Sequence, residues 1–480
     1  MKRQRLRFKL LAVFLFLLFG ALAVYGSYSV LTYGNRWFSS IRNPRVRTQR
    51  EQVIPGDILD TDGVVLASTD PEGNRRYAED PAVRRALVHL VGDRQGHVSN
   101  GVETFQTSYL YGFQASLLDQ VGDLLAGNAR TGDSVQLTVS APLTAALADA
   151  FRQHETTAGK PAAAVILNWK TGAVAALTSL PSFDPEDIGG TVDAGDKAFW
   201  NRVTQARIPP GSTFKIVTAA SALDHLPQAR EVTVTCSTDV LDFGGHTIGD
   251  YGGEAHGTVD LRSAFTQSCN KMFATLAMNL GAGDLRQTAE QFGFNDNFLF
   301  RDLVVENSSF PERIGSDYEL AACGFGQSSI TATPLHLCMI AAGVANGGVM
   351  MEPRLLQRVT SASGSQRLGF SSAEYRTCMS PATAALLGEY MRGAVTGGTG
   401  WRAAVPGLTV CGKTGTADST DGGEPIVYGW FAGYIADEEL PYAIAVVVEG
   451  LDSGTTGGST AALVAHDAFL WLRDHRPDAP

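Results

Sequence analysis

The sequence predicts an α+β fold in which an antiparallel sheet is flanked and crossed by helices, after one N-terminal membrane-spanning helix. Three observations predict it: two apolar strands meet at a Lys-Thr-Gly turn within 162–180, three more strands lie near the C-terminus, and helical patterns fill the chain between. The C-terminal strands are expected at 408–416, 426–436 and 441–450, before a helix at 459–475. Strands at both ends with helices between them are typical of a layered α+β domain.

Start and stop signals in the sequence predict the positions of the helices. A Ser start and apolar spacing near 3.6 predict a helix at 140–154. Pro209-Pro210-Gly211 introduces a helix at 212–224, and glycines end one at 333–348. A further helical pattern covers 261–281. Residues 53–67, with Pro-Gly and Asp-Gly punctuation between apolar runs, predict a strand and hairpin.

Composition bounds the function. The 480 residues are 44% apolar and 18% charged, which excludes wholesale disorder and allows about two or three domains. Residues 1–50 contain ten Lys and Arg and no acidic residue, whereas the other 430 residues carry a net charge of −21. Because binding to phosphates requires clustered Lys and Arg, this acidic body argues against a nucleic-acid partner.

The basic N-terminal end is expected to be a membrane anchor. Residues 1–9 hold five positive charges and form a cytoplasmic tail, and residues 10–31 carry no charge. A helix of that length reaches about 33 Å, enough to cross a hydrocarbon core of ~30 Å. The positive charges keep the N-terminus inside, so the body lies outside. Ala21-Leu22-Ala23 leaves a cleaved signal peptide as the alternative, with the same location for the body.

The cysteines form no recognisable metal or disulfide pattern. They lie at Cys236, Cys269, Cys323, Cys338, Cys378 and Cys411. Without a CxxC or dense spacing, mostly free thiols are expected, although the spacing does not forbid a bridge. His246, Asp250, Glu254 and His256 lie in a Gly-rich loop, but the pattern is that of a solvated loop. No metal and no cofactor is predicted.

Ser212-Thr213-Phe214-Lys215 is an S-x-x-K motif, which brings a hydroxyl and an amine together on one helix face. Serine becomes a nucleophile only when a base removes its proton, and lysine can be that base when its pKa is lowered. Pro-Pro-Gly places Ser212 at the helix start, where the dipole favours developing negative charge. One such motif is weak evidence, and Ser268-Cys269-Asn270-Lys271 is a second match.

Residues 407–414 fit the phosphate-binding pattern G-x-x-x-x-G-K-[ST]. That reading fails because Leu408-Thr409-Val410 is strand-like and the residues after Thr414 cannot open a helix, so no nucleotide is expected. The alternative places Lys413-Thr414-Gly415-Thr416 on an edge strand. There Thr414 and Thr416 share a face suited to a carboxylate, and Gly415 leaves room for a peptide-like ligand.

S-x-x-K, S-x-N and K-T-G in this order resemble the penicillin-recognising serine enzymes. Here they are Ser212/Lys215, Ser268/Asn270 and Lys413/Thr414/Gly415. From the anchor to the end, the chain resembles a class B penicillin-binding protein. The stretches PPGSTFK, GFGQSSITATPLHL and GWFAGY resemble stretches found in that family. Thr61 departs from the family, which usually has Arg there. The region after the anchor lacks a glycosyltransferase signature, so a bifunctional enzyme is not expected.

The resemblance implies a transpeptidase domain of the penicillin-binding/serine β-lactamase-like fold at 156–480, on a non-catalytic linker and pedestal at 32–155. It implies that Lys215 activates Ser212 as the nucleophile and that Ser268 relays a proton. Asn270 and Lys413 complete the catalytic set. Thr414, Gly415 and Thr416 bind substrate, and the backbone N–H groups of Ser212 and Thr416 form the oxyanion hole.

The implied activity is D,D-transpeptidation of peptidoglycan stem peptides ending in D-Ala-D-Ala, with inhibition by β-lactams. Implied partners are these stem peptides, β-lactams and a membrane glycosyltransferase of the elongation, division or sporulation machinery. The location is the bacterial cytoplasmic membrane, with the catalytic domain outside. Two alternatives remain open: a D,D-carboxypeptidase or β-lactamase-type hydrolase, and a non-catalytic β-lactam receptor or cell-wall scaffold.

Overall fold

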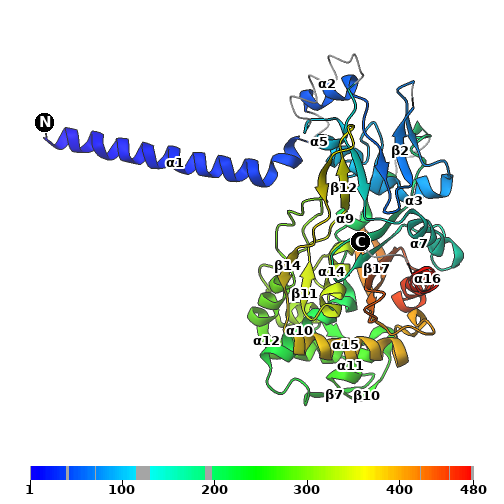
Figure 1. Ribbon diagram of the computed structural model, residues 1–480. Helices are drawn as coiled ribbons and strands as arrows, with labels where there is room; N and C mark the ends of the chain where they lie inside the picture. The colour runs from blue at the N-terminus through cyan, green and yellow to red at the C-terminus, as the bar shows by residue number, and fades with distance from the viewer. Residues whose placement is uncertain are drawn as a thin grey trace.

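The computed structural model describes residues 2–38, 43–70, 72–114, 130–189, 197–421, 423–452 and 454–476. The predicted anchor lies in helix α1 (Lys2–Phe38), which projects away from the rest of the chain (Figure 1). Its 27-residue stretch Gln4–Val30 is long and apolar enough to cross a membrane and is not buried against the protein. This fits a single-pass membrane protein.

The segment next to the anchor folds into a small mixed sheet with short helices. Residues 34–50, expected as a linker, contain the start of helix α2, which begins at Pro44 after the Asn43 cap. The predicted strand and hairpin at 53–67 is present as β1 and β2, paired antiparallel. The elements are α2 (Pro44–Gln52), β1 (Ile58–Leu59), β2 (Val65–Thr69), β3 (Arg75–Tyr77), α3 (Pro81–Val91), α4 (Val102–Phe105), α5 (Thr107–Leu110) and β4 (Ser134–Leu137).

This sheet is completed by residues more than 200 positions further along the chain. Its strand order is β13-β12-β4-β1-β2-β3, with β12 (Leu356–Thr360) and β13 (Gln366–Gly369) added to β4. Figure 1 shows β12, in yellow, beside the blue and cyan N-terminal elements. The N-terminal sheet therefore depends on residues from the C-terminal half.

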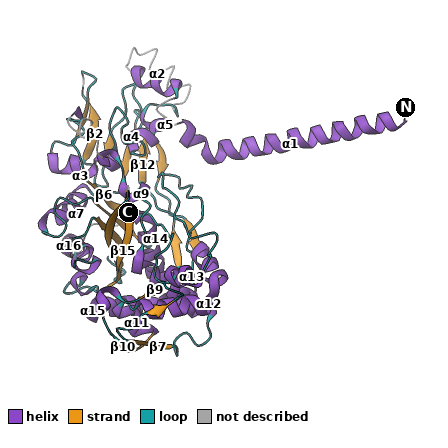
Figure 2. Cartoon of the chain, turned by 180° about the vertical axis from the view of Figure 1, so that it is seen from behind, coloured by secondary structure: helices purple, strands orange, loops and turns teal. Residues whose placement is uncertain are grey.

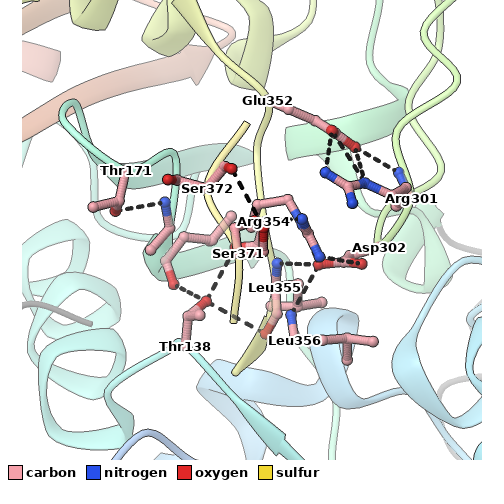
Figure 3. Close-up of polar contacts among 12 residues, drawn as sticks. Thr138, Thr171, Arg301, Asp302, Glu352, Arg354, Leu355, Leu356, Ser371 and Ser372 are labelled. Atoms are coloured by element: carbon pink, nitrogen blue, oxygen red, sulfur yellow. Dashed lines mark hydrogen bonds and ion pairs between the residues drawn. The ribbon is translucent and has the colours of Figure 1, made fainter. Parts of the chain in front are cut away.

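A buried ion pair holds the chain where it enters β12. The Asp302 carboxylate accepts hydrogen bonds from Arg354 Nε at 2.8 Å and from the Leu355 and Leu356 amides at 3.0 and 3.1 Å (Figure 3). Thr138, just beyond β4, donates to the Arg354 carbonyl at 3.1 Å. These contacts join the segment before β12 to the N-terminal sheet.

The predicted fold class is confirmed by a five-stranded antiparallel sheet with helices on both faces. The strand order is β15-β16-β17-β5-β6, so the hairpin predicted at 162–180 pairs through β5 with the C-terminal strands. The strands are β5 (Ala162–Asn168), β6 (Val174–Leu180), β15 (Val410–Asp421), β16 (Glu424–Ile435) and β17 (Tyr442–Glu449). β15 is an edge strand, as the second reading of residues 413–416 predicted.

Alternate residues of β5 pack into two hydrophobic layers. Ala163, Val165 and Leu167 belong to the larger core, and Ala162, Ala164 and Ile166 to the smaller one. The smaller core lies under α7 (Ala141–Gln153) and α16 (Ala461–His475), and α14 (Pro334–Ala345) covers the opposite face (Figure 2). Ser140 caps α7 and Thr333 caps α14, close to the predicted starts.

The remaining helices and strands complete the fold. They are η1 (Lys197–Phe199), α9 (Arg202–Gln205), η2 (Gly211–Phe214), α10 (Lys215–His225), β7 (Thr233–Cys236), β8 (Leu241–Asp242), β9 (Thr247–Ile248), η3 (Tyr251–Gly253), β10 (Gly257–Asp260), α11 (Leu261–Gln267), α12 (Asn270–Gln291), α13 (Asp317–Cys323), β11 (Val349–Met351), β14 (Glu374–Thr377), α15 (Pro381–Gly397), η4 (Trp401–Ala403) and η5 (Gly457–Ser459).

Two predicted helices differ from the structure. The helix expected at 212–224 opens with the 3₁₀ turn η2 and becomes α-helical only at Lys215. The helix expected at 261–281 was wrong as one element: Ser268 adopts φ 63° and ψ 36°, which ends α11 and starts a new helix, α12. Both departures lie at predicted site residues.

Candidate active site

The predicted site residues meet around a cleft of about 1120 Å³. The cleft lies between turn η2, the α11–α12 junction, the edge strand β15 and the loop that follows β9. Its lining includes Ser212, Ser268, Asn270, Thr414, Gly415 and Thr416. A cleft of this size is large enough for a peptide segment rather than a single small ion.

Ser212 is positioned by glycines that allow backbones to approach closely. Gly211 has φ +51°, and a Cβ on it would lie 2.6 Å from the carbonyl oxygen of Thr416. The Gly211 amide donates to the Gly326 carbonyl at 3.0 Å, and Gly326 has φ +79°. A side chain at Gly211 would push the turn away from β15, and one at Gly326 would clash with the Gly211 carbonyl, so the two glycines allow Ser212 to lie beside Thr416.

Ser268 lies in a left-handed turn between two helices, and that conformation is uncommon for a residue other than glycine. The turn places Ser268 and Asn270 on the cleft while Cys269 is completely buried. The Asn270 side-chain amide donates to the Gly249 carbonyl at 3.0 Å, and its backbone amide donates to the Asp250 carboxylate. These two hydrogen bonds to residues 249–250 therefore hold the S-x-N motif in place.

Two buried lysines meet at the Ser268 hydroxyl. Lys215 Nζ lies 3.2 Å from Ser268 Oγ and donates to the Ser268 carbonyl at 2.6 Å and to Asn270 Oδ1 at 2.8 Å. Lys413 Nζ lies 2.8 Å from the same Oγ and donates to the Thr414 carbonyl at 3.0 Å. One hydroxyl thus connects amines from two distant motifs.

Burial changes the protonation of both amines, because water no longer solvates the charged form. Burial lowers the pKa of Lys215 to about 7, although nearby acidic groups act to raise it. Burial and the charge of Lys215 also lower the pKa of Lys413 well below its ordinary value. An amine with a pKa near 7 can accept a proton at neutral pH.

Residues 412–416 form regular strand rather than a phosphate-binding loop. Lys413, Thr414 and Thr416 pair in register with Ala432, Phe431 and Gly429 of β16. The Thr414 and Thr416 side chains line the cleft. The geometry agrees with the edge-strand reading and leaves no loop that could wrap a phosphate.

The second S-x-x-K match does not form a pair. Lys271 is buried, donates to the Ser237 carbonyl at 2.5 Å and does not line the cleft. Two polar residues support the motifs instead: Thr399, which sequence reasoning missed, and Asp250, which it noted only as part of a solvated loop. Thr399 Oγ1 lies 2.6 Å from Thr414 Oγ1, and Asp250 anchors Asn270. Neither belongs to a motif, so only the folded chain identifies them.

The four polar residues noted in the Gly-rich loop have different surroundings, and Glu254 Oε2 lies 3.5 Å from His256 Nε2. His246 packs against the Tyr318 ring, with centroids 4.9 Å apart. Asp250 and His256 instead meet Cys236 and Cys269, and the four potential ligand atoms all lie within 4.8 Å of one another. Sequence reasoning did not connect these cysteines with the loop.

Comparison with known proteins agrees with this geometry. Residues 162–469 match the penicillin binding protein transpeptidase domain. The peptidoglycan D,D-transpeptidase PbpA of Mycobacterium tuberculosis is 32% identical over 454 residues, covering 88% of this chain and 89% of the relative. PbpA of Mycolicibacterium smegmatis is 28% identical over 444 residues, covering 88% and 89%.

The solved structure of penicillin-binding protein A from M. tuberculosis, a ceftriaxone acyl-enzyme complex, superposes with a TM-score of 0.78 at 27% identity. The match covers 88% of this chain and 98% of that one. The chain therefore belongs to the penicillin-binding protein transpeptidase family, as a class B penicillin-binding protein and a serine transpeptidase.

Proposed function

We propose that this chain is a peptidoglycan D,D-transpeptidase that forms an acyl-enzyme on Ser212. The observation that carries the proposal is the Ser268 hydroxyl, which lies within hydrogen-bond distance of both Lys215 and Lys413 beside the Ser212 turn. A nucleophile, a base with a lowered pKa and a proton relay are what acyl transfer requires.

In the first half-reaction, neutral Lys215 takes the proton from Ser212 Oγ. The oxygen attacks the carbonyl carbon of the penultimate D-Ala, and the C–N bond to the terminal D-Ala breaks. Ser268 passes a proton from the lysine amines to the leaving amine. The backbone N–H groups of Ser212 and Thr416 stabilise the oxyanion, a role supported by the close approach of Gly211 to the Thr416 backbone.

In the second half-reaction, the amine of a neighbouring stem peptide attacks the ester of Ser212. Its proton passes through Lys215 to the Ser212 oxygen, the C–O bond of the ester breaks to release the free Ser212 hydroxyl, and a new amide cross-links the two peptides. A β-lactam follows the first half only, because its opened ring stays attached and the acyl-Ser212 persists.

Substrate is held along the edge strand. The substrate carboxylate binds the hydroxyls of Thr414 and Thr416 near the Lys413 amine, and Gly415 leaves space for the peptide backbone. Asn270 donates to the substrate amide. Thr399 supports Thr414 through their hydroxyl contact of 2.6 Å.

We further assign the chain to the bacterial cytoplasmic membrane, with the N-terminus inside and the catalytic domain outside. The basic residues at the N-terminal end of α1 support this orientation. In this assignment residues 32–155 are a non-catalytic pedestal that carries the transpeptidase domain, residues 156–480. A membrane glycosyltransferase that makes the glycan strands is the expected partner.

Labelling with a fluorescent penicillin tests the proposal. The wild type and Ser268→Ala are compared with Ser212→Ala, each as full-length protein in detergent. We expect Ser212→Ala to abolish the covalent band because the attacking oxygen is gone. Label that persisted and mapped to Ser268 would show that the nucleophile has been assigned wrongly.

The lifetime of the acyl-enzyme separates transfer from hydrolysis. A transpeptidase keeps the penicilloyl group attached over many minutes, whereas a β-lactamase releases it within seconds. Release within seconds would overturn the proposal in favour of the hydrolytic alternative.

A further inference from the structure

We propose that Cys236, Asp250, His256 and Cys269 bind a zinc ion directly beneath the S-x-N motif. The four donor atoms converge on one point: Cys236 Sγ lies 3.0 Å from Cys269 Sγ and 3.2 Å from His256 Nδ1, and it also contacts the Asp250 carboxylate. All four atoms lie within 4.8 Å of one another.

The chemistry of the donors selects zinc. Two thiolates, one imidazole and one carboxylate form a four-ligand tetrahedral set of the kind that Zn²⁺ prefers, whereas Ca²⁺ and Mg²⁺ require oxygen ligands. Zn–S bonds of about 2.3 Å place two sulfurs roughly 3.7 Å apart. The two sulfurs, which are 3.0 Å apart, therefore need to separate by roughly 0.7 Å to receive the ion.

The site is closed, as a structural zinc site should be. Cys236 and Cys269 are fully buried, and the side chains of Asp250 and His256 are 2% and 13% exposed. A carboxylate and the thiolate form of the two cysteines are costly to bury together unless a cation compensates their charge. Four protein ligands leave no open position, so the ion is structural.

The surrounding groups orient the ligands. His256 Nε2 faces the Glu254 carboxylate at 3.5 Å, which leaves the Nδ1 lone pair directed at the cluster. Cys269 caps helix α12, with its sulfur 3.5 Å from the Met272 amide, where the helix dipole favours a thiolate.

The ion would couple the loop to the catalytic motif. The two carboxylate oxygens of Asp250 have different partners. Oδ1 accepts from the Asn270 backbone amide, and Oδ2 faces Cys236 and His256. Cys269 itself lies between Ser268 and Asn270. A metal bound here would hold the left-handed turn of Ser268 in place from two sides and so act as a positioning element for acylation.

The competing explanations are a Cys236–Cys269 disulfide and a metal-free hydrogen-bonded cluster. A disulfide would require the sulfurs to approach to about 2.05 Å. It would involve only two of the four converging donors and would give Asp250 and His256 no cation to bind. The four-donor convergence favours the metal.

Metal content tests the proposal on full-length protein purified in detergent without added metal. We expect about one zinc per chain by mass spectrometry of the metal, and alkylation of all six cysteines once the protein is unfolded with chelator. Cys236→Ser and His256→Ala should each retain less than roughly a tenth of the zinc. His246→Ala and Cys323→Ser, which change residues outside the cluster, should retain it.

A second measurement does not depend on the variants folding. Cobalt substituted into the wild type should give a thiolate-to-cobalt charge-transfer band and tetrahedral visible bands. Zinc removal should lower the melting temperature and slow penicillin acylation, and zinc re-addition should restore both. Metal-free protein in which only four cysteines are alkylated would indicate the disulfide, and metal-free protein in which all six are alkylated would indicate the hydrogen-bonded cluster. Either result would overturn the proposal. Because metal content is measured without substrate, this result is independent of the transpeptidase assignment.

Discussion

The pH dependence of acylation follows from the environment of Lys215. Burial lowers the pKa of this amine to about 7, and only the neutral amine can take the proton of Ser212. The neutral fraction is then roughly one tenth at pH 6, one half at pH 7 and nine tenths at pH 8. The second-order rate constant for penicillin acylation should therefore rise about fivefold from pH 6 to 7 and less than twofold from pH 7 to 8.

Stopped-flow mixing with a fluorescent penicillin measures this profile. Stability changes in the same direction: the unfolded amine has its ordinary pKa of 10.5, so the unfolded state binds the extra proton between about pH 7 and 10.5, and stability rises with pH in that window. End-point labelling at each pH corrects for unfolded protein, and Lys215→Met supplies the baseline. A rate that is flat or falls between pH 6 and 8 would refute Lys215 as the base.

Two further substitutions test how the site is held. Asp302→Asn leaves Arg354 without its carboxylate in a pair whose side chains are each 3% exposed, so we expect a loss of about 3–5 kcal/mol in urea unfolding. Glu352→Gln, which removes an ion pair whose guanidinium is 54% exposed, should cost less than about 1 kcal/mol; equal losses would contradict this reasoning. Gly326→Ala would place a Cβ 2.0 Å from a carbonyl oxygen of the Ser212 turn, so penicillin labelling should be lost while far-ultraviolet circular dichroism is retained. Full labelling of that variant would show that the turn tolerates displacement.

The central sheet was predictable because its signal is local. Two apolar runs on either side of the Lys-Thr-Gly turn identify β5 and β6, and further apolar runs identify the three C-terminal strands. Alternation along β15 also indicated that Thr414 and Thr416 share a face. The order of the motifs was sufficient to suggest which residues meet, although they are up to about 200 positions apart.

The breaks in the helices were not predictable from periodicity. Within 261–281, apolar residues continue at helical spacing on both sides of Ser268. No residue in this stretch predicts a left-handed turn. The Asp250 contact that supports the turn comes from a segment 20 residues earlier in the sequence. For the same reason Cys236 could not be grouped with His256, because their separation of 20 residues fits no short metal motif.

The sharing of the N-terminal sheet has a consequence for synthesis. Strand β4 is flanked by β1 on one side and by β12 on the other, so its second edge is open until residues near 360 have left the ribosome. During that interval more than 200 residues are made while an unpaired strand edge is exposed to other chains. The N-terminal sheet, although encoded first, is among the last parts of the protein that can finish folding, and a truncated chain ending before β12 should be prone to aggregation.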